Sequence, residues 1–245
     1  MRSASRLSPL LIAAAVTTLA GCATTQQTAA RLRVNDARIR ASQLPTEVLR
    51  DDRSIEVLGV SVVGGPSGSA MVVTLRNLAG TPVSDLPISV GLIDGGHRRY
   101  LNGAAGSDYF QTHLPAISRR GTLTWVFTTP RRLPGQTRPF AVVGVPAAPP
   151  LSLPRTLPDL AARLTRASGA LRGGELQISV QNRSSLPQYQ LPVYATASRG
   201  GHYVAAGQAT IEQLDGGASS RLELHLTGDT NGASVAIEAP PTIFS

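Results

Sequence analysis

The chain has 245 residues, a formal net charge of +8 and 23 basic residues, all of them arginine. Its single cysteine excludes a disulfide within the chain, so stability must come from a packed core. Aromatic residues make up only 4% of the sequence, while glycine and proline are abundant, and this composition favours short strands joined by turns over long helices.

The first 21 residues have the pattern of a secretory signal peptide. Arg2 and Arg6 supply a basic start, and an apolar run follows from residue 7 to residue 19. This run is shorter than the roughly 20 apolar residues that a bilayer-spanning helix needs. We therefore predict that residues 1–21 direct export and are then removed.

The signal ends in Leu19-Ala20-Gly21-Cys22, which resembles the lipobox of bacterial lipoproteins. The resemblance implies that the Cys22 thiol receives a diacylglycerol, that the chain is cut before Cys22, and that the new amino group can be acylated. It implies a lipid-anchored, extracytoplasmic protein of the cell envelope. The membrane would be the outer membrane, facing the periplasm, if the host has one, and otherwise the outer face of the plasma membrane. The alternative is an ordinary secretory signal that happens to contain a cysteine.

The remaining chain divides into segments of different pattern. Residues 22–52 are polar and weakly patterned, as expected of a tether that separates a folded part from the membrane. Residues 53–145 contain runs of alternating apolar and polar residues, which indicate strands with one buried face. Residues 146–158 are rich in proline and are predicted to form a stiff, extended linker. Residues 159–245 return to the alternating pattern.

The second alternating block repeats the first at a shift of 105 residues. The repeated features include an asparagine, Asn77 and Asn182, and a Gly-Gly-His tripeptide that ends at His97 and at His202. We interpret the repeat as a tandem duplication. The matching positions on the predicted strands are Met71, Val73 and Leu75 with Leu176, Ile178 and Val180, and, after a short deletion, Leu123, Trp125 and Phe127 with Leu222, Leu224 and Leu226.

Each block contains about seven short strands separated by turn signals, which is the pattern of a β-sandwich. In both copies an asparagine ends the second strand, and a short loop, an apolar third strand and a Gly-rich hairpin follow. This arrangement resembles the immunoglobulin-like domains of bacterial lipoproteins, with FxLYD-type modules as the nearest family. We therefore predict an all-β fold of two tandem immunoglobulin-like β-sandwich domains, at 53–145 and 159–245. The resemblance implies an adhesion, adaptor or scaffolding module and supplies no catalytic residue.

The sequence shows no residue cluster with catalytic or metal-binding spacing. His97 and His202 each lack the three or four converging ligands of a metal site, so we expect each to begin a strand after a hairpin turn. There is no G-x-S-x-G nucleophile motif, and the Gly-rich segment 64–68 lacks the lysine of a phosphate-binding loop. We predict no enzymatic activity, no metal and no cofactor. Nucleic acid is not expected as a partner, because the arginines are not interleaved with aromatic residues.

Three arginine doublets in the first block carry the binding hypothesis; they are Arg98-Arg99, Arg119-Arg120 and Arg131-Arg132. A GC-rich genome is one explanation for arginine in place of lysine, and a surface that binds phosphates or carboxylates is the other. We predict that partner binding concentrates in residues 98–120, with Arg98, Arg99, Tyr109 and Phe110 as contacts. The alternative is that Tyr109 and Phe110 only close the end of the sandwich.

The predicted function is that of a membrane-anchored, extracytoplasmic, non-catalytic binding or adaptor module. Its expected partners are the membrane, through lipid on Cys22, and another envelope protein or an anionic envelope polymer. One alternative is a structural scaffold for envelope assembly. A second is an enzyme with a site at the domain junction.

Overall fold

The computed structural model describes residues 50–103, 108–134, 137–146, 156–168 and 174–243, together with Leu32, Val48, Leu153 and Pro154. The predicted signal peptide, Cys22, most of the 22–52 tether and much of the 146–158 linker lie outside the described residues. Within the described ranges, no helix has the length and hydropathy needed to cross a membrane.

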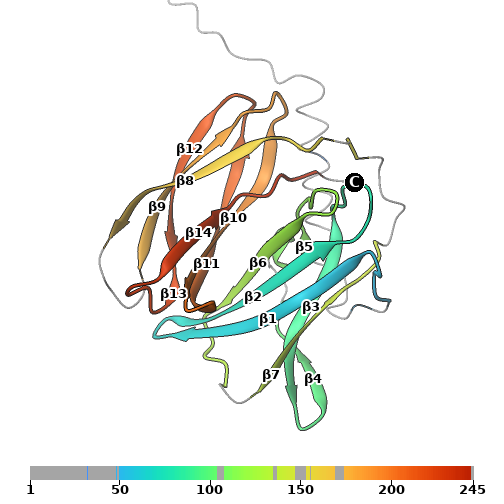
Figure 1. The fold of residues 1–245 in the computed structure, drawn as a ribbon, viewed down its shortest axis with the longest axis vertical. Coiled ribbons are helices and arrows are strands. Elements are labelled where there is room, and N and C mark those ends of the chain that lie inside the picture. The colour runs from blue at the N-terminus through green and yellow to red at the C-terminus, as the bar shows by residue number, and fades with distance from the viewer. Residues whose placement is uncertain are drawn as a thin grey trace, which may run out of the picture.

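The N-terminal half, residues 50–146, forms two antiparallel sheets (Figure 1). In one sheet the strand order is β1-β2-β6; in the other, β3 pairs with β4 and β5 along one edge and with β7 along the other. A short 3-10 helix, η1 (Tyr109–Gln111), precedes β5. The strands are β1 (Ile55–Gly65), β2 (Gly68–Asn77), β3 (Leu86–Asp94), β4 (His97–Tyr100), β5 (His113–Leu114), β6 (Thr122–Thr129) and β7 (Arg138–Val143).

The C-terminal half, residues 156–243, repeats this arrangement with sheets of order β12-β9-β8 and β13-β11-β10-β14. The protein is therefore all-β, and in each half two antiparallel sheets enclose a core between their facing sides. The strands are β8 (Leu160–Ser168), β9 (Glu175–Asn182), β10 (Gln188–Arg199), β11 (His202–Leu214), β12 (Ser219–His225), β13 (Thr227–Gly228) and β14 (Ser234–Glu238).

Strand alternation places the predicted residues in the core of the N-terminal half. Trp125 on β6 is fully buried and lies opposite Val73 on β2, which is fully buried as well. These side chains point away from the β1-β2-β6 sheet toward Ile88 and Val90 on β3, and all four belong to one apolar cluster. The predicted inward phase of β2 and β6 is confirmed.

A buried asparagine closes the end of β2. The Asn77 side-chain amide donates to the carbonyls of Thr81 and Ser118 at 2.9 and 3.1 Å, and its oxygen accepts the Ala79 N–H at 2.8 Å. Asn77 is fully buried, so no water competes for these bonds. The side chain therefore joins the loop after β2 to the loop before β6.

Asn182 makes the same bonds at the end of β9. Its amide donates to the carbonyls of Leu186 and Asp215 at 2.8 and 3.2 Å, and its oxygen accepts the Ser184 N–H at 3.0 Å. Asn182 is also fully buried. The repeat found in the sequence thus extends to hydrogen bonding, atom by atom.

The strand register corrects the predicted match of Trp125 with Leu224. Trp125 lies opposite Val73, and Ile178, which is the equivalent of Val73, lies opposite Leu222. Trp125 therefore corresponds to Leu222, two residues earlier than predicted. Leu222 and Leu224 both point inward, since they lie on the same face of β12, and Leu224 is only 1% exposed.

An insertion in the N-terminal half explains this correction. The β10–β11 hairpin is continuous, whereas its counterpart breaks after β4 and resumes at β5. Residues 101–112, which include η1, stand where the C-terminal half has only residues 206–209. The offset between the two copies therefore falls from 105 to 97 after the insertion, and apolar alternation alone does not reveal a shift by an even number of residues.

The two halves pack face to face, as the adjoining strands of Figure 1 show. β11 contacts β1, β2 and β6, which places the outer side of the β1-β2-β6 sheet against the outer side of the β10-β11 hairpin. Tyr194 and Ala206 from the C-terminal half are buried in the same apolar cluster as Val72 and Val126. Glu238 adds a polar contact, accepting the backbone N–H of Thr124 at 3.1 Å. β2 is therefore buried on both faces. That each half is a domain able to fold independently stays a prediction.

Tyr194 is a buried tyrosine of this junction whose ionisation is clearly perturbed. Burial, with a smaller contribution from the Glu238 carboxylate, raises the pKa of the Tyr194 hydroxyl well above its ordinary value of 10.0. The hydroxyl oxygen is buried and has no hydrogen-bond partner in the described structure. It therefore adds no bond to the junction.

Tyr194→Phe is expected to leave the free energy of unfolding near pH 7 unchanged or to raise it by about 1 kcal/mol, because it removes an unsatisfied buried hydroxyl. Above about pH 10 the parent should lose stability, since Tyr194 ionises in the unfolded chain while the folded chain keeps it protonated. The variant should lack this part of the alkaline loss. Denaturant unfolding of both proteins across this pH range measures the difference, and a clear destabilisation of the variant at pH 7 would show that the hydroxyl has a partner.

Candidate functional site

The predicted contact residues divide into a buried pair and an exposed pair. Tyr109 and Phe110, in η1, are each only 5% exposed. The Tyr109 ring stacks on His113 at 4.2 Å and its hydroxyl donates to Asp85, while the Phe110 carbonyl accepts the Trp125 indole N–H at 2.9 Å. These contacts agree with the alternative that the pair closes the end of the sandwich. A role in partner contact stays a prediction, and it would require this end to open.

Arg98 and Arg99 lie on β4 and are exposed. The Arg98 guanidinium lies over the Phe140 ring, 5.1 Å from its centroid, and Tyr100 meets the same ring edge-on at 5.4 Å. Gly91 lies between these rings on β3, and a Cβ there would come within 2.8 Å of Phe140 and 2.2 Å of the Arg99 carbonyl. A glycine at this position therefore lets the aromatic pair form and hold Arg98 in place.

A further arginine, which the sequence did not single out, joins Arg98 on the same face. In the β3 register, Ile93 lies opposite Arg98 on β4 and opposite Arg138 on β7. The two arginines therefore flank Ile93 on the outer side of this sheet, in the row next to Tyr100 and Phe140. We call these five residues the arginine face; Arg99, one position along β4, points to the opposite side.

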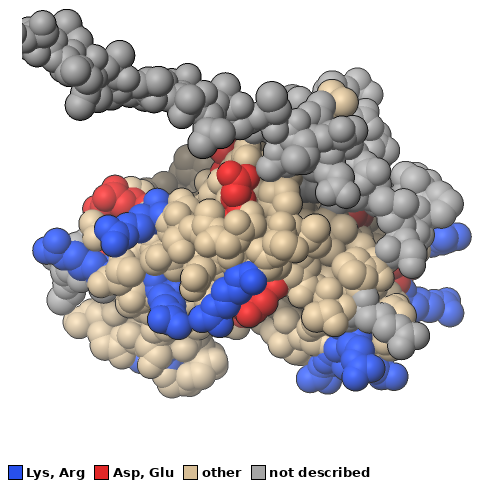
Figure 2. Space-filling model, turned by 90° about the horizontal axis from the view of Figure 1, so that it is seen from above, with Lys and Arg blue, Asp and Glu red and all other residues tan. Residues whose placement is uncertain are grey.

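Basic charge is concentrated in the N-terminal half. Residues 53–145 hold nine arginines against four acidic residues, whereas residues 159–245 hold six against seven. Figure 2 shows arginines in separate groups on the face seen from above, with few acidic side chains between them. Three arginines have ion-pair partners among the described residues, and neither Arg98 nor Arg138 is one of them; the pairs are Arg76–Glu56, Arg183–Asp159 and Arg199–Asp229.

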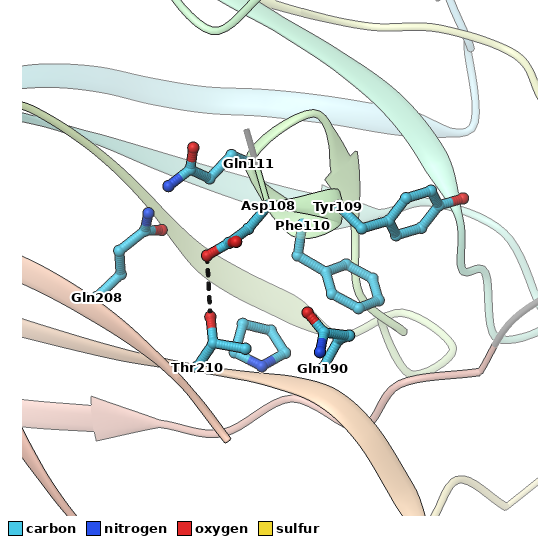
Figure 3. A pocket seen from close by; sticks show the side chains of 8 residues that line it. Asp108, Tyr109, Phe110, Gln111, Gln190, Gln208 and Thr210 are labelled. Atoms are coloured by element: carbon cyan, nitrogen blue, oxygen red, sulfur yellow. Dashed lines mark hydrogen bonds between the residues drawn. The ribbon is translucent and has the colours of Figure 1, made fainter. Parts of the chain in front are cut away.

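A small cavity lies at the junction, between η1 and the outer side of β10 and β11 (Figure 3). The Thr210 hydroxyl donates to the Asp108 carboxylate at 3.4 Å across it, and the Phe110 ring points toward Gln190. The volume of the cavity is about 10 Å³, which corresponds to roughly one water molecule. A cavity of this size is too small for a substrate, and the alternative of an enzyme site at the domain junction stays a prediction. A second, open depression, lined by Arg50, Asp51, Arg53 and Val145, lies where the chain enters β1.

Comparison of the chain with protein-family models gives no match, and comparison with curated proteins gives none either.

The two equivalent histidines lie at matching hairpins. Gly95 and Gly96 before His97 have φ values of 54° and 84°, and Gly200 and Gly201 before His202 have 58° and 81°. This left-handed backbone explains the repeated Gly-Gly, because residues with a side chain rarely adopt it. Both histidines are exposed, and the described residues contain no group of three or more His, Cys, Asp and Glu that could hold a metal ion.

Proposed function

We propose that the chain is a lipid-anchored, extracytoplasmic protein of the cell envelope that acts by binding rather than by catalysis. The observation that carries the proposal is Leu19-Ala20-Gly21-Cys22, placed after a basic start and a short apolar run. A compact all-β body with a basic N-terminal half is compatible with a protein that presents a surface to a partner.

The proposed fold family is that of the immunoglobulin-like modules, of the FxLYD type. Strand order supports this assignment: β1-β2-β6 and β4-β3-β7 have the connectivity of strands A-B-E and C′-C-F of an immunoglobulin sandwich, and the C-terminal half repeats it. Among the described residues, no further strand pairs with the outer edge of β7 as strand G would.

A scaffold is the second candidate, and the junction favours it. Because the two halves share a buried apolar cluster and the Glu238–Thr124 hydrogen bond, the described part should behave as one rigid body. Such a body would hold partners bound to its two halves in a constant relative position.

Cys22→Ser is expected to abolish stable membrane attachment, because it removes the predicted acylation site. Two or three acyl chains anchor a protein stably, at about 0.8 kcal/mol per buried CH₂. The measurement is fractionation of cells into membrane and soluble parts after a high-salt wash, which removes proteins held by charge alone.

Ser3→Ala, a substitution outside the Leu19–Cys22 motif, serves as the control and should stay in the membrane fraction. If the Cys22→Ser protein also remains there after the wash, the lipid assignment is wrong. A separate experiment distinguishes a binding module from a scaffold: the proteins that copurify with the native chain after detergent extraction are identified.

A further inference from the structure

We infer that the arginine face, centred on Arg98 and Arg138, docks onto the anionic lipid headgroups of the membrane that carries the anchor. The inference rests on the proposed function, since the lipid on Cys22 brings the chain to that membrane. The arginine face would supply a second attachment to the membrane, in addition to the lipid anchor.

The charge on this face is uncompensated within the described structure. The outer side of β3, β4 and β7 carries no acidic residue, and neither Arg98 nor Arg138 has a carboxylate partner. Asp94, next to Ile93 on β3, points to the opposite side because side chains alternate along a strand. Both guanidinium groups are therefore available to an external anion.

The arrangement suits a flat anionic surface better than a single anion. Arg98 and Arg138 lie one strand apart on either side of β3, so their Cα atoms are about 10 Å apart. Arg98 is supported by Phe140, which reduces the entropy lost on binding. The partly buried Ile93 lies between the arginines, and the partly buried Tyr100 lies in the next row; tyrosine is enriched at membrane interfaces.

The tether is long enough to let this face contact the membrane. The Asp52 N–H donates to the Val143 carbonyl at 2.8 Å, so the tether joins the body at one end of β7, and Arg138 lies at the other end. Six residues of strand span about 17 Å, whereas the roughly 30 residues between Cys22 and Asp52 can span up to about 100 Å. Tethering also raises the local concentration of headgroups, which favours lipid over a freely diffusing acidic protein.

The test uses the chain from residue 23 onward, which keeps every described strand and lacks the acylated cysteine. Binding is measured by cosedimentation at low salt with vesicles that mix phosphatidylglycerol and phosphatidylcholine, and with vesicles of phosphatidylcholine alone. We expect the parent to bind only the anionic vesicles. Arg98→Gln with Arg138→Gln should weaken that binding about 25-fold, since each basic residue near an anionic surface contributes about fivefold.

Arg163→Gln with Arg166→Gln is the matched control, because both arginines are exposed on β8 in the C-terminal half. It removes the same net charge and should weaken binding less than about twofold. Equal losses in the two double variants, an unchanged affinity of Arg98→Gln/Arg138→Gln, or equal binding of the parent to neutral vesicles would each overturn the inference.

A poly-glutamate arm separates lipid from protein partners. If the parent binds poly-glutamate but not anionic vesicles, and the Arg98→Gln/Arg138→Gln protein loses that binding, the face belongs to an acidic protein and the lipid inference fails. Because no acyl group is present in this experiment, its outcome is independent of the Cys22→Ser fractionation. Circular dichroism of each variant verifies that the fold is retained.

Discussion

Trp125→Ala is expected to lower the free energy of unfolding by about 3–5 kcal/mol, which is a large part of the stability of an ordinary domain. Trp125 is fully buried, packs beside Phe127 with ring centroids 6.3 Å apart, and donates its indole N–H to the Phe110 carbonyl. Truncation would leave a cavity between the two sheets and remove this hydrogen bond. Denaturant unfolding, followed by circular dichroism, measures the loss.

One further variant separates the lost apolar contact from the lost hydrogen bond, and a second serves as the control. Trp125→Phe keeps most of the apolar contact and removes the hydrogen bond, so it should cost about 1–2 kcal/mol. Thr122→Ala alters an exposed position on the same strand and should cost less than about 0.5 kcal/mol. Similar losses for Trp125→Ala and Thr122→Ala would contradict the inward phase of β6.

The second large effect is expected at the duplicated asparagine. Asn77→Ala and Asn182→Ala should each lower the free energy of unfolding by about 3 kcal/mol, because each removes three hydrogen bonds of a buried side chain and deprives one backbone N–H, that of Ala79 or Ser184, of its acceptor. The two losses should be similar, since the bonds are the same. Unfolding midpoints and slopes in urea provide the measurement.

Asn77→Asp tests the donor role of this side chain with almost no change of shape. A carboxylate would face the Thr81 and Ser118 carbonyls without a hydrogen to donate, so the loss should be at least as large as for Asn77→Ala. Asn231→Ala, at an exposed loop position, is the control and should be nearly neutral. If Asn77→Asp is tolerated, the described hydrogen bonds do not hold the loops together.

The sequence predicted strands, their inward faces and the repeat, because each depends on local alternation or on matching residues at one offset. It did not predict that β2 would be buried on both faces. The run from Ala70 to Val73 is fully buried, since the C-terminal half covers its outer side, and no local pattern shows which half does the covering. The match of Trp125 with Leu224 was wrong for a related reason: the 101–112 insertion changes the offset by an even number and preserves the inward phase.

The predicted binding residues show the same limit. Arginines and aromatics near residues 98–120 were recognisable by type, but their exposure depends on tertiary packing, which buries Tyr109 and Phe110 and leaves Arg98 accessible. Arg138 is isolated in the sequence and reaches Arg98 only through pairing of β7 and β4 with β3.

By itself the sequence determined the all-β class, the phase of the main strands and the duplication, because side-chain periodicity and repeated turns act over a few residues. Only the tertiary structure decided which strand is buried on both of its faces, which aromatic residues close the end of the sandwich and which arginines share a surface. These outcomes follow from strand register and from the packing of one half on the other, and both bring together residues far apart in the chain.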